Sequence, residues 1–336
     1  ASPLGISAGK PKLELAKTVE WKDGIVKRLT GGVGGLLKKA KVRQVSGEAR
    51  FIDGKTVTVK TAEGDQVIRA GNVVIATGSV PVELPFLPFG GDVISSTEAL
   101  SLAAPPKNLA VVGAGYIGLE LGIAFAKMGS KVAVVEAVDR ILPLYDSELT
   151  RPVAKRLKSL GVEIWLGAKA KGRGKGGKGL LIETDDGKEE TLAADKILVT
   201  VGRKPATEGW GREDLVLDMN GRYIRIDEQC QTSMVGIYAI GDVTGEPMLA
   251  HRAMAQGEMV AEIVAGLNRR WDRKAVAAVC FTDPEIVSVG LSSQEAKEQG
   301  IEAKSQVFPF SANGRAMTME GEDGFVRVVA RADNHV

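Results

Sequence analysis

Residues 109–118 read Leu-Ala-Val-Val-Gly-Ala-Gly-Tyr-Ile-Gly, and this stretch decides the fold of the chain. Four apolar residues, 109–112, run directly into a Gly-x-Gly-x-x-Gly turn, and an amphipathic helical pattern begins at Tyr116. Glycine-rich turns are common, but a strand that enters such a turn and leaves it as a helix is the context in which the motif binds a dinucleotide. The sequence therefore predicts a nucleotide-binding turn here.

Each glycine of the turn has its own expected task. Gly113 permits the sharp change of direction, Gly115 lets the backbone approach a pyrophosphate, and Gly118 lets helix and strand pack closely. The free N–H groups and the positive dipole end at the start of the helix favour the phosphates. We expect the pyrophosphate of a bound nucleotide to lie at this helix start.

Glu136 follows the next predicted strand and stands 18 residues beyond Gly118. A carboxylate in this place accepts hydrogen bonds from the adenosine ribose hydroxyls and repels a 2′-phosphate, which favours NAD over NADP. The alternative interpretation is a solvated glutamate that ends a strand.

Around the turn, strands and helices alternate between residues 109 and 201, a pattern that predicts βαβ units and a parallel, Rossmann-like sheet in an α/β fold. Before it, the sequence predicts a helix over 21–40, weakened by four glycines, and short strands over 42–45, 49–52 and 56–60. From about residue 275 it predicts antiparallel strands with a helix over 292–299, and so a further domain.

Composition narrows the class of protein. The chain has 336 residues with 44% apolar and 26% charged side chains, which is typical of a soluble protein of two or three domains. Its 44 basic and 42 acidic side chains give no reason to expect a nucleic-acid partner or a membrane surface. Cys230 and Cys280 form neither a disulfide framework nor a metal pattern, and no leader-like segment opens the sequence. We expect a cytoplasmic protein without a metal site.

One basic segment, residues 171–179, reads Lys-Gly-Arg-Gly-Lys-Gly-Gly-Lys-Gly and invites a phosphate- or nucleic-acid-binding interpretation. It has no interleaved aromatic residues and no terminal Lys-Ser/Thr pair. A surface hairpin tip explains it better.

A second candidate site consists of two small-residue turns that each end a buried strand. These turns are Ala76-Thr77-Gly78 and Ala239-Ile240-Gly241-Asp242. From physical chemistry alone, Asp242 is a ligand-binding carboxylate or a structural turn residue with about equal weight.

Together these segments resemble the pyridine nucleotide–disulfide oxidoreductases, and within that family the dihydrolipoyl dehydrogenases. The resemblance also includes residues 247–253 (Pro-Met-Leu-Ala-His-Arg-Ala), 281–285 and 310–316, so it covers essentially the whole chain. It implies a two-dinucleotide-binding flavoprotein fold followed by the start of an α+β dimerisation domain. The expected divisions are 1–82 (part of the FAD domain), 83–204 (NAD domain), 205–272 (a segment that completes the FAD site) and 273–336 (incomplete interface domain).

The resemblance also implies which residues hold the two cofactors, FAD and NAD. The expected FAD residues are Ala49, Thr77, Gly78, Ser79, Asp242, Met248, Leu249, Ala250 and His251. The expected NAD residues are Gly113, Ala114, Gly115, Tyr116, Ile117, Gly118, Glu120, Glu136 and Gly202. The Tyr116 ring either covers the flavin until the nicotinamide displaces it or simply packs on the sheet.

The residues that oxidise the dithiol in this family are not found in the sequence. The family carries its redox disulfide in a Cys-x4-Cys segment upstream of everything present here, and a His–Glu pair near its C-terminus. Cys230 and Cys280 are too far apart to be the first, and neither His251 nor His335 is assigned to the second. We therefore expect a chain truncated at both ends, with no catalytic residue of its own.

The implied function is electron transfer from dihydrolipoyl groups through that disulfide and FAD to NAD⁺. The implied partners are a second copy, forming a homodimer, and the lipoyl domains of a 2-oxo acid dehydrogenase complex, with residues 257–263 resembling the form of bacterial branched-chain complexes. The alternatives are a related mercuric reductase, NADH oxidase or transhydrogenase, or a non-catalytic nucleotide-binding fragment.

Glu136 generates the first prediction. The full-length protein is expected to use NAD⁺ far better than NADP⁺, because the carboxylate repels the 2′-phosphate. The measurement is kcat/KM with each nucleotide, and comparable values for the two would contradict the prediction.

Overall fold

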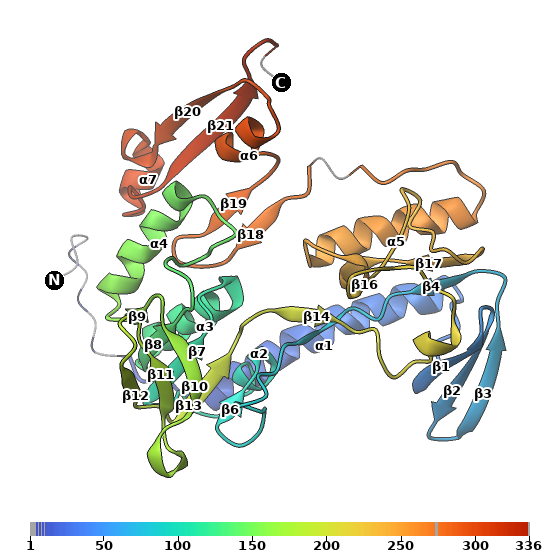
Figure 1. The fold of residues 1–336 in the computed structure, drawn as a ribbon, viewed down its shortest axis with the longest axis horizontal. Helices are drawn as coiled ribbons and strands as arrows, with labels where there is room; N and C mark the ends of the chain where they lie inside the picture. Colours follow the sequence, from blue (N-terminus) through green and yellow to red (C-terminus); the bar gives the residue numbers. More distant parts are fainter. Residues whose placement is uncertain (1–4, 6, 8, 10, 273–274, 335–336) are drawn as a thin grey trace. The chain divides into compact units, whose positions relative to one another are not determined.

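A computed structural model describes residues 5, 7, 9, 11–272 and 275–334, and the chain forms two compact units. The first unit comprises residues 1–44, 83–143 and 157–201, and the second comprises 45–82, 144–156 and 202–336. The two are described separately below, with element labels as in Figure 1. His335, named above, lies outside the described residues.

The first unit contains a five-stranded sheet in the order β6-β13-β7-β8-β9, in which every neighbouring pair is parallel. The central strand, β7 (Asn108–Val112), is apolar and buried from Leu109 onward, as expected for a strand covered on both faces. The other strands are β6 (Val93–Ile94), β8 (Lys131–Val135), β9 (Glu163–Trp165) and β13 (Lys196–Val199). The predicted parallel α/β sheet is confirmed.

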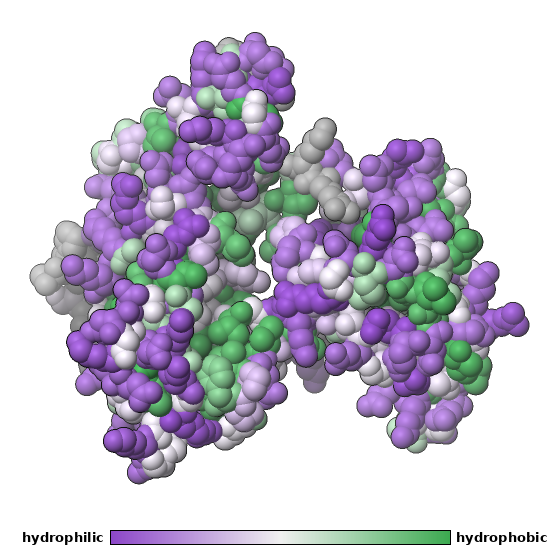
Figure 2. Space-filling model, in the orientation of Figure 1, coloured by the Kyte–Doolittle hydropathy of each residue, from purple (hydrophilic) through white to green (hydrophobic). Residues whose placement is uncertain are grey.

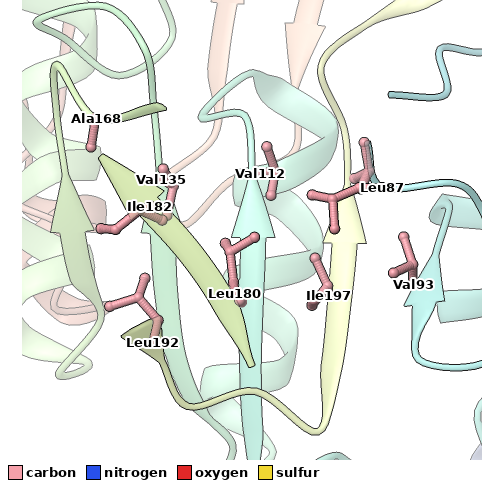
Figure 3. Packing of buried hydrophobic residues seen from close by; sticks show 11 residues of the cluster. Leu87, Val93, Val112, Val135, Ala168, Leu180, Ile182, Leu192 and Ile197 are labelled. Atoms are coloured by element: carbon pink, nitrogen blue, oxygen red, sulfur yellow. The ribbon is translucent and has the colours of Figure 1, made fainter. Parts of the chain in front are cut away.

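Two layers cover this sheet. Helix α3 (Tyr116–Lys127) packs on β7 and β8 through its buried side, which includes Leu119, Ile123 and Phe125. An antiparallel sheet packs with the parallel one in a shared apolar core, drawn in Figure 3, to which Leu180, Ile182 and Leu192 contribute. Its strands are β10 (Lys169–Arg173), β11 (Leu180–Glu183) and β12 (Glu189–Leu192).

The basic segment 171–179 forms the end of β10 and the turn that leads into β11. Lys171 pairs with Glu183 at 2.9 Å and Arg173 pairs with Asp92, so part of its charge is neutralised within the unit. The prediction that this segment forms the tip of a hairpin is therefore confirmed.

Helix α1 (Leu15–Lys39) and the short α2 (Ser96–Ala99) complete the first unit. The predicted helix start at residue 21 was wrong, because the helix begins six residues earlier and continues through all four of its clustered glycines. The predicted strand over 42–45 was also wrong, since these residues form no regular structure.

The second unit begins with an antiparallel sheet of β1 (Glu48–Asp53), β2 (Thr56–Thr61) and β3 (Gly64–Arg69). Strand β4 (Val73–Ile75) pairs in parallel with β17 (Ile237–Ala239), although 161 residues lie between Ile75 and Ile237 in the sequence. Strand β5 (Ser79–Pro81) pairs with β14 (Arg203–Pro205), and β15 (Met219–Asn220) with β16 (Tyr223–Ile224). Residues far apart in sequence therefore share one core, which includes Phe51, Trp210 and Ile237.

Helix α5 (Ala250–Val264) follows β17 and the short turn η3 (Gly241–Thr244). The C-terminal part contains two antiparallel pairs, β18 (Ala278–Cys280) with β19 (Ile286–Ser288) and β20 (Ala303–Pro309) with β21 (Phe325–Arg331). Helices α6 (Ser293–Glu298) and α7 (Gly314–Thr318) accompany them, and the predicted antiparallel tail with its helix is confirmed. Cys230 and Cys280 are fully buried and are not joined in a disulfide.

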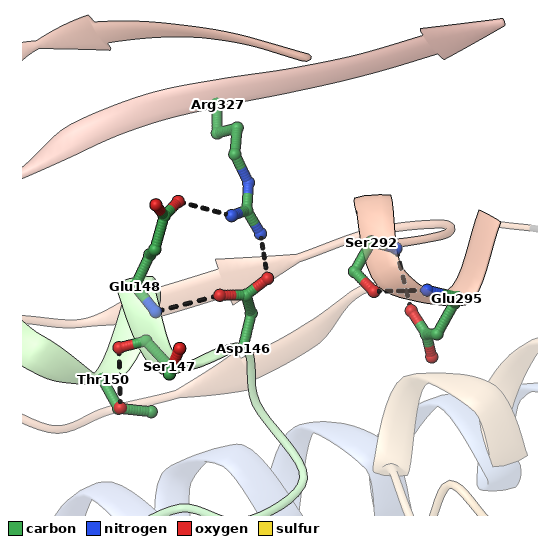
Figure 4. A network of polar contacts seen from close by, with 7 residues as sticks. All are labelled: Asp146, Ser147, Glu148, Thr150, Ser292, Glu295 and Arg327. Atoms are coloured by element: carbon green, nitrogen blue, oxygen red, sulfur yellow. Dashed lines mark hydrogen bonds and ion pairs between the residues drawn. The ribbon is translucent and has the colours of Figure 1, made fainter. Parts of the chain in front are cut away.

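Arg327 on β21 binds the start of helix α4 (Ser147–Ser159), as Figure 4 shows. Its guanidinium donates to Asp146 at 2.9 Å and to Glu148 at 2.8 Å, and only 10% of the side chain is exposed. Burial lowers the pKa of Arg327, but the hydrogen bonds and charges of the two carboxylates outweigh it and hold the pKa above its ordinary value. Asp146 also accepts from the Glu148 amide at 2.9 Å and so caps the helix.

The face in Figure 2 is largely hydrophilic, in keeping with 26% charged residues. Within the described residues, every helix is too short or too polar to span a bilayer.

The Arg327 contact generates a prediction about stability. Arg327→Met is expected to lower the free energy of unfolding by roughly 1–3 kcal/mol, because Asp146 and Glu148 lose charge-assisted hydrogen bonds. Denaturant unfolding of the full-length protein measures this loss. The matched control is Arg331→Met, at the end of the same strand, which removes an exposed pair with Asp333 and is expected to leave the midpoint unchanged. Equal effects of the two variants would contradict the prediction.

Candidate functional site

The dinucleotide turn lies where β7 meets α3, in the first unit. Gly113 has φ +100°, a conformation that L side chains rarely adopt, and a Cβ there would lie 2.7 Å from the Thr200 carbonyl oxygen. At Gly118 a Cβ would lie 2.2 Å from the carbonyl oxygen of Gly113 and 2.6 Å from Thr200 Oγ1. Both positions therefore accept only glycine, for reasons of packing within the fold.

Gly115 differs from its two neighbours in the motif. A Cβ at Gly115 would meet no protein atom within 4 Å, so the fold itself leaves space there. The residue is the N-cap of α3, and no side chain caps the helix. An open cradle beside uncapped N–H groups fits a pyrophosphate.

The sheet order places this turn at a topological switch point. The chain leaves β7 toward β8 on one side, whereas β13 pairs with the other side of β7. The carboxyl ends of β7 and β13 meet there, since the Thr200 hydroxyl donates to the carbonyls of Val112 and Gly113. Nucleotides bind in α/β sheets at such points.

Glu136 comes directly after β8 and reaches back to the turn. Its Oε2 accepts a hydrogen bond from the Ala114 amide at 2.7 Å, and its Oε1 accepts one from the Val138 amide at 3.1 Å. Each carboxylate oxygen keeps a second lone pair, so both can still accept from ribose hydroxyls. The carboxylate is thus fixed beside the glycine turn by the backbone.

The other residues predicted to bind NAD fall into three places. Tyr116, Ile117 and Glu120 lie in the first two turns of α3 and are half-buried, and Ala114 is fully buried in the turn itself. Gly202 belongs to the second unit, where its carbonyl accepts from the Val82 amide at 3.0 Å.

A pocket of about 270 Å³ lies in the second unit, where β4 and β17 end and α5 begins. Four of the predicted FAD residues line it: Gly78, Asp242, Met248 and Ala250. Sequence reasoning missed the remaining lining residues, which are Ala76, Ile240, Gly241 and Ala253. Ala76, Ile240 and Gly241 belong to the turns 76–78 and 239–242. Ala253 follows Ala250 by about one turn of α5, so the positions of these residues in the sequence could have identified them.

Asp242 is held by a chain of polar contacts. Its Oδ2 accepts from Ser79 Oγ at 2.6 Å, and that Ser79 oxygen accepts from Arg203 Nε at 2.7 Å. A second guanidinium nitrogen of Arg203 donates to the Ser79 carbonyl at 2.7 Å. The carboxylate is therefore oriented at the pocket wall by groups from β5 and β14.

Five predicted FAD residues do not line this pocket. The Thr77 hydroxyl donates to the Ala206 carbonyl at 2.8 Å, and His251 Nε2 lies 2.8 Å from the Ala277 carbonyl oxygen. Ser79 contacts the pocket through Asp242, Leu249 is the N-cap of α5, and Ala49 is exposed on β1. Throughout the described ranges, no group of three or more His, Cys, Asp or Glu side chains is arranged to hold a metal ion.

The contrast between Gly115 and Gly118 generates the next prediction. Gly115→Ala is expected to fold normally but to weaken NAD binding at least about tenfold, because the methyl group fills the pyrophosphate cradle. Gly118→Ala is expected to lower stability by roughly 1–3 kcal/mol, because the backbone at Gly113 must move. Thermal unfolding and NAD titration of both full-length variants check this. Unchanged NAD affinity in Gly115→Ala would contradict the prediction. Gly129→Ala cannot serve as a control, because Gly129 has φ +98°, a conformation that L side chains rarely adopt.

Residues 4–257 match the family model described as pyridine nucleotide-disulphide oxidoreductase, and residues 276–336 match its dimerisation domain. A dihydrolipoyl dehydrogenase of Pseudomonas aeruginosa is 57% identical over 336 residues, which is 100% of this chain and 72% of the relative. A dihydrolipoyl dehydrogenase of Geobacillus stearothermophilus is 44% identical over 335 residues, 99% of this chain and 71% of the relative.

Solved structures agree with this likeness. The LpdA structure from Mycobacterium tuberculosis superposes with a TM-score of 0.88 at 27% identity, covering 97% of this chain and 72% of that one. The predicted two-nucleotide flavoprotein fold and the predicted cofactors, FAD and NAD, are confirmed at the level of the family, and the dimerisation-domain match supports a homodimer. The chain belongs to the pyridine nucleotide-disulphide oxidoreductase family.

Proposed function

We propose that the protein is a dihydrolipoyl dehydrogenase, which oxidises a dihydrolipoyl dithiol to its cyclic disulfide and reduces NAD⁺ to NADH with release of a proton. The observation that carries the proposal is the 57% identity, over the entire chain, to a relative of that name. When bound, FAD supplies the two-electron chemistry that links a redox disulfide to NAD⁺.

For FAD, the proposed task of Asp242 is to accept hydrogen bonds from the ribityl hydroxyls. Its position at the pocket wall and its fixed orientation through Ser79 and Arg203 support this task. Gly78 has φ +71° with open space beside it, which leaves room for a ligand against the backbone. The further proposed FAD residues are Ala49, Thr77, Ser79, Met248, Leu249, Ala250 and His251.

For NAD, the proposed task of the turn is to bind the pyrophosphate at Gly115 and the start of α3. The open cradle and the uncapped helix support it. Glu136 would accept from the adenosine ribose, since the Ala114 and Val138 amides hold its carboxylate beside the turn. Gly113, Ala114, Tyr116, Ile117, Gly118, Glu120 and Gly202 complete the proposed set.

The proposed partners are the lipoyl domains of a 2-oxo acid dehydrogenase complex, with the branched-chain complex as the specific candidate. The proposed location is the cytoplasm, which is supported by two buried cysteines that are not joined in a disulfide. The proposed domain boundaries remain those at residues 82, 204 and 272.

The proposal predicts two properties of the purified full-length protein. It is expected to show flavin absorbance and to reduce NAD⁺ in the presence of dihydrolipoamide, because this chain carries the residues proposed above to bind FAD and NAD. Absorbance spectra and NADH formation measure the two properties.

The outcomes separate the alternatives. Bound flavin with NADH oxidation but no turnover of dihydrolipoamide would replace the proposal by a mercuric reductase, NADH oxidase or transhydrogenase. Absence of flavin together with absence of NAD⁺ reduction would point to a non-catalytic nucleotide-binding protein.

A further inference from the structure

Two polar side chains lie on the buried face of helix α5. Arg252 is 5% exposed and Gln256 is 2% exposed. With the buried Met259 and Val260 they follow the spacing i, i+4, i+7, i+8, which is one face of a helix directed at the core. A guanidinium and an amide in such a place need hydrogen-bond partners, because leaving them without partners is costly.

Both side chains bind a single turn, residues 241–245. Arg252 Nη2 donates to the Gly241 carbonyl at 2.7 Å and to Thr244 Oγ1 at 2.9 Å, while Nη1 donates to the Gly245 carbonyl at 2.8 Å. Gln256 Oε1 accepts from the Gly241 amide at 2.8 Å. Helix α5 thus binds both the N–H and the C=O of Gly241.

This turn needs support from outside. Gly241 has φ +72° and Gly245 has φ +134°, so glycines in left-handed conformations stand at both ends of residues 241–245. Within the segment, the Gly245 amide donates to the Asp242 carbonyl at a long 3.4 Å, and the Thr244 hydroxyl donates to the Gly241 carbonyl at 2.8 Å. A glycine-rich backbone of this kind can adopt many other conformations when no contact holds it in place.

The residue that the turn carries is Asp242, between the two glycines. Asp242 and Gly241 line the 270 Å³ pocket, whereas Arg252 and Gln256 do not. A Cβ on Gly241 would lie 3.0 Å from the Ala253 Cβ, so α5 also packs directly against the turn. The two polar side chains therefore act on the pocket only through the backbone that presents Asp242.

We infer that Arg252 and Gln256 are positioning residues that fix the 241–245 turn and hold Asp242 ready for FAD. The inference rests on the proposed function, in which Asp242 binds the flavin. A turn that is already ordered avoids the entropic cost of ordering when FAD binds. The contacts of Arg252 and Gln256 with residues 241–245, called the clamp below, therefore raise the affinity for FAD without touching it.

The test uses full-length protein from which FAD has been removed, titrated with FAD by flavin fluorescence. Arg252→Met and Gln256→Leu are each expected to raise the Kd for FAD about tenfold or more, since each leaves buried groups of the turn without a partner. Gln256→Glu keeps an acceptor for the Gly241 amide and is expected to retain near-normal affinity. The matched controls are Arg269→Met and Gln294→Leu, which change exposed side chains paired with Glu262 and Glu298.

Hydrogen exchange supplies a second readout that a general loss of stability would not mimic. In Arg252→Met and Gln256→Leu, amides of residues 241–245 are expected to exchange faster, while those of the adjoining β17 keep their protection. Should Arg252→Met fail to fold, the comparison of Gln256→Leu with Gln256→Glu decides the question.

Two results would overturn the inference. Normal FAD affinity in Gln256→Leu, alongside lost affinity in Asp242→Ala, would remove the clamp and leave the proposed FAD site standing. Equal loss of protection in the turn and in β17 would reduce both residues to a structural role. Normal affinity in Asp242→Ala would instead refute the proposed FAD site.

Discussion

The contact between Gly118 and the Gly113 carbonyl sets the distance between α3 and β7, and the nucleotide site depends on that distance. With 2.2 Å between that oxygen and an imagined Cβ, only hydrogen fits. The Thr200 hydroxyl fills the remaining space and binds the carbonyls of Val112 and Gly113. Helix, central strand and β13 are therefore locked together at the edge where the N-terminus of α3 opens.

The two candidate sites share one construction. In each, a buried strand ends at a glycine with positive φ, a helix begins nearby, and a carboxylate is held by groups from another segment. Backbone amides hold Glu136, and Ser79 with Arg203 holds Asp242. Both carboxylates are thus oriented by the protein itself, which suits the recognition of hydroxyl groups on ribose and ribityl chains.

Much of this arrangement could be predicted because its signals are local. The strand, turn and helix around Gly113 follow from residue types within ten positions, and Glu136 follows from the length of one βαβ step. Helix α1 was harder, since its glycines argue against a helix that nonetheless runs over 25 residues. Strand β3 was missed because its mixed sequence, Gly64–Arg69, gains its register only from pairing with β2.

Local patterns predicted no contact between distant segments, and only the family resemblance placed Gly78 and Asp242 in one site. Nothing near Arg252 or Gln256 in the sequence reveals that both bind the turn at Gly241, although their helical spacing with Met259 and Val260 marks a buried face. The pairing of β4 with β17 likewise joins segments that only the folded chain brings together. Such contacts depend on tertiary packing, which the periodicity of a single sequence does not encode.

The ion pairs of α4 have a consequence for how this family diverges. Besides the Arg327 contacts, Lys155 pairs with Asp323 at 2.6 Å and Arg156 with Asp283 at 2.8 Å, so the helix presents carboxylates at its start and cations further along. The two later pairs are exposed and cost little to lose, so drift can alter either partner alone. Arg327 is 10% exposed, and its substitution leaves the carboxylates of Asp146 and Glu148 without this cation. Among homologous sequences, covariation should therefore concentrate on positions 146, 148 and 327, and the other pairs should vary independently.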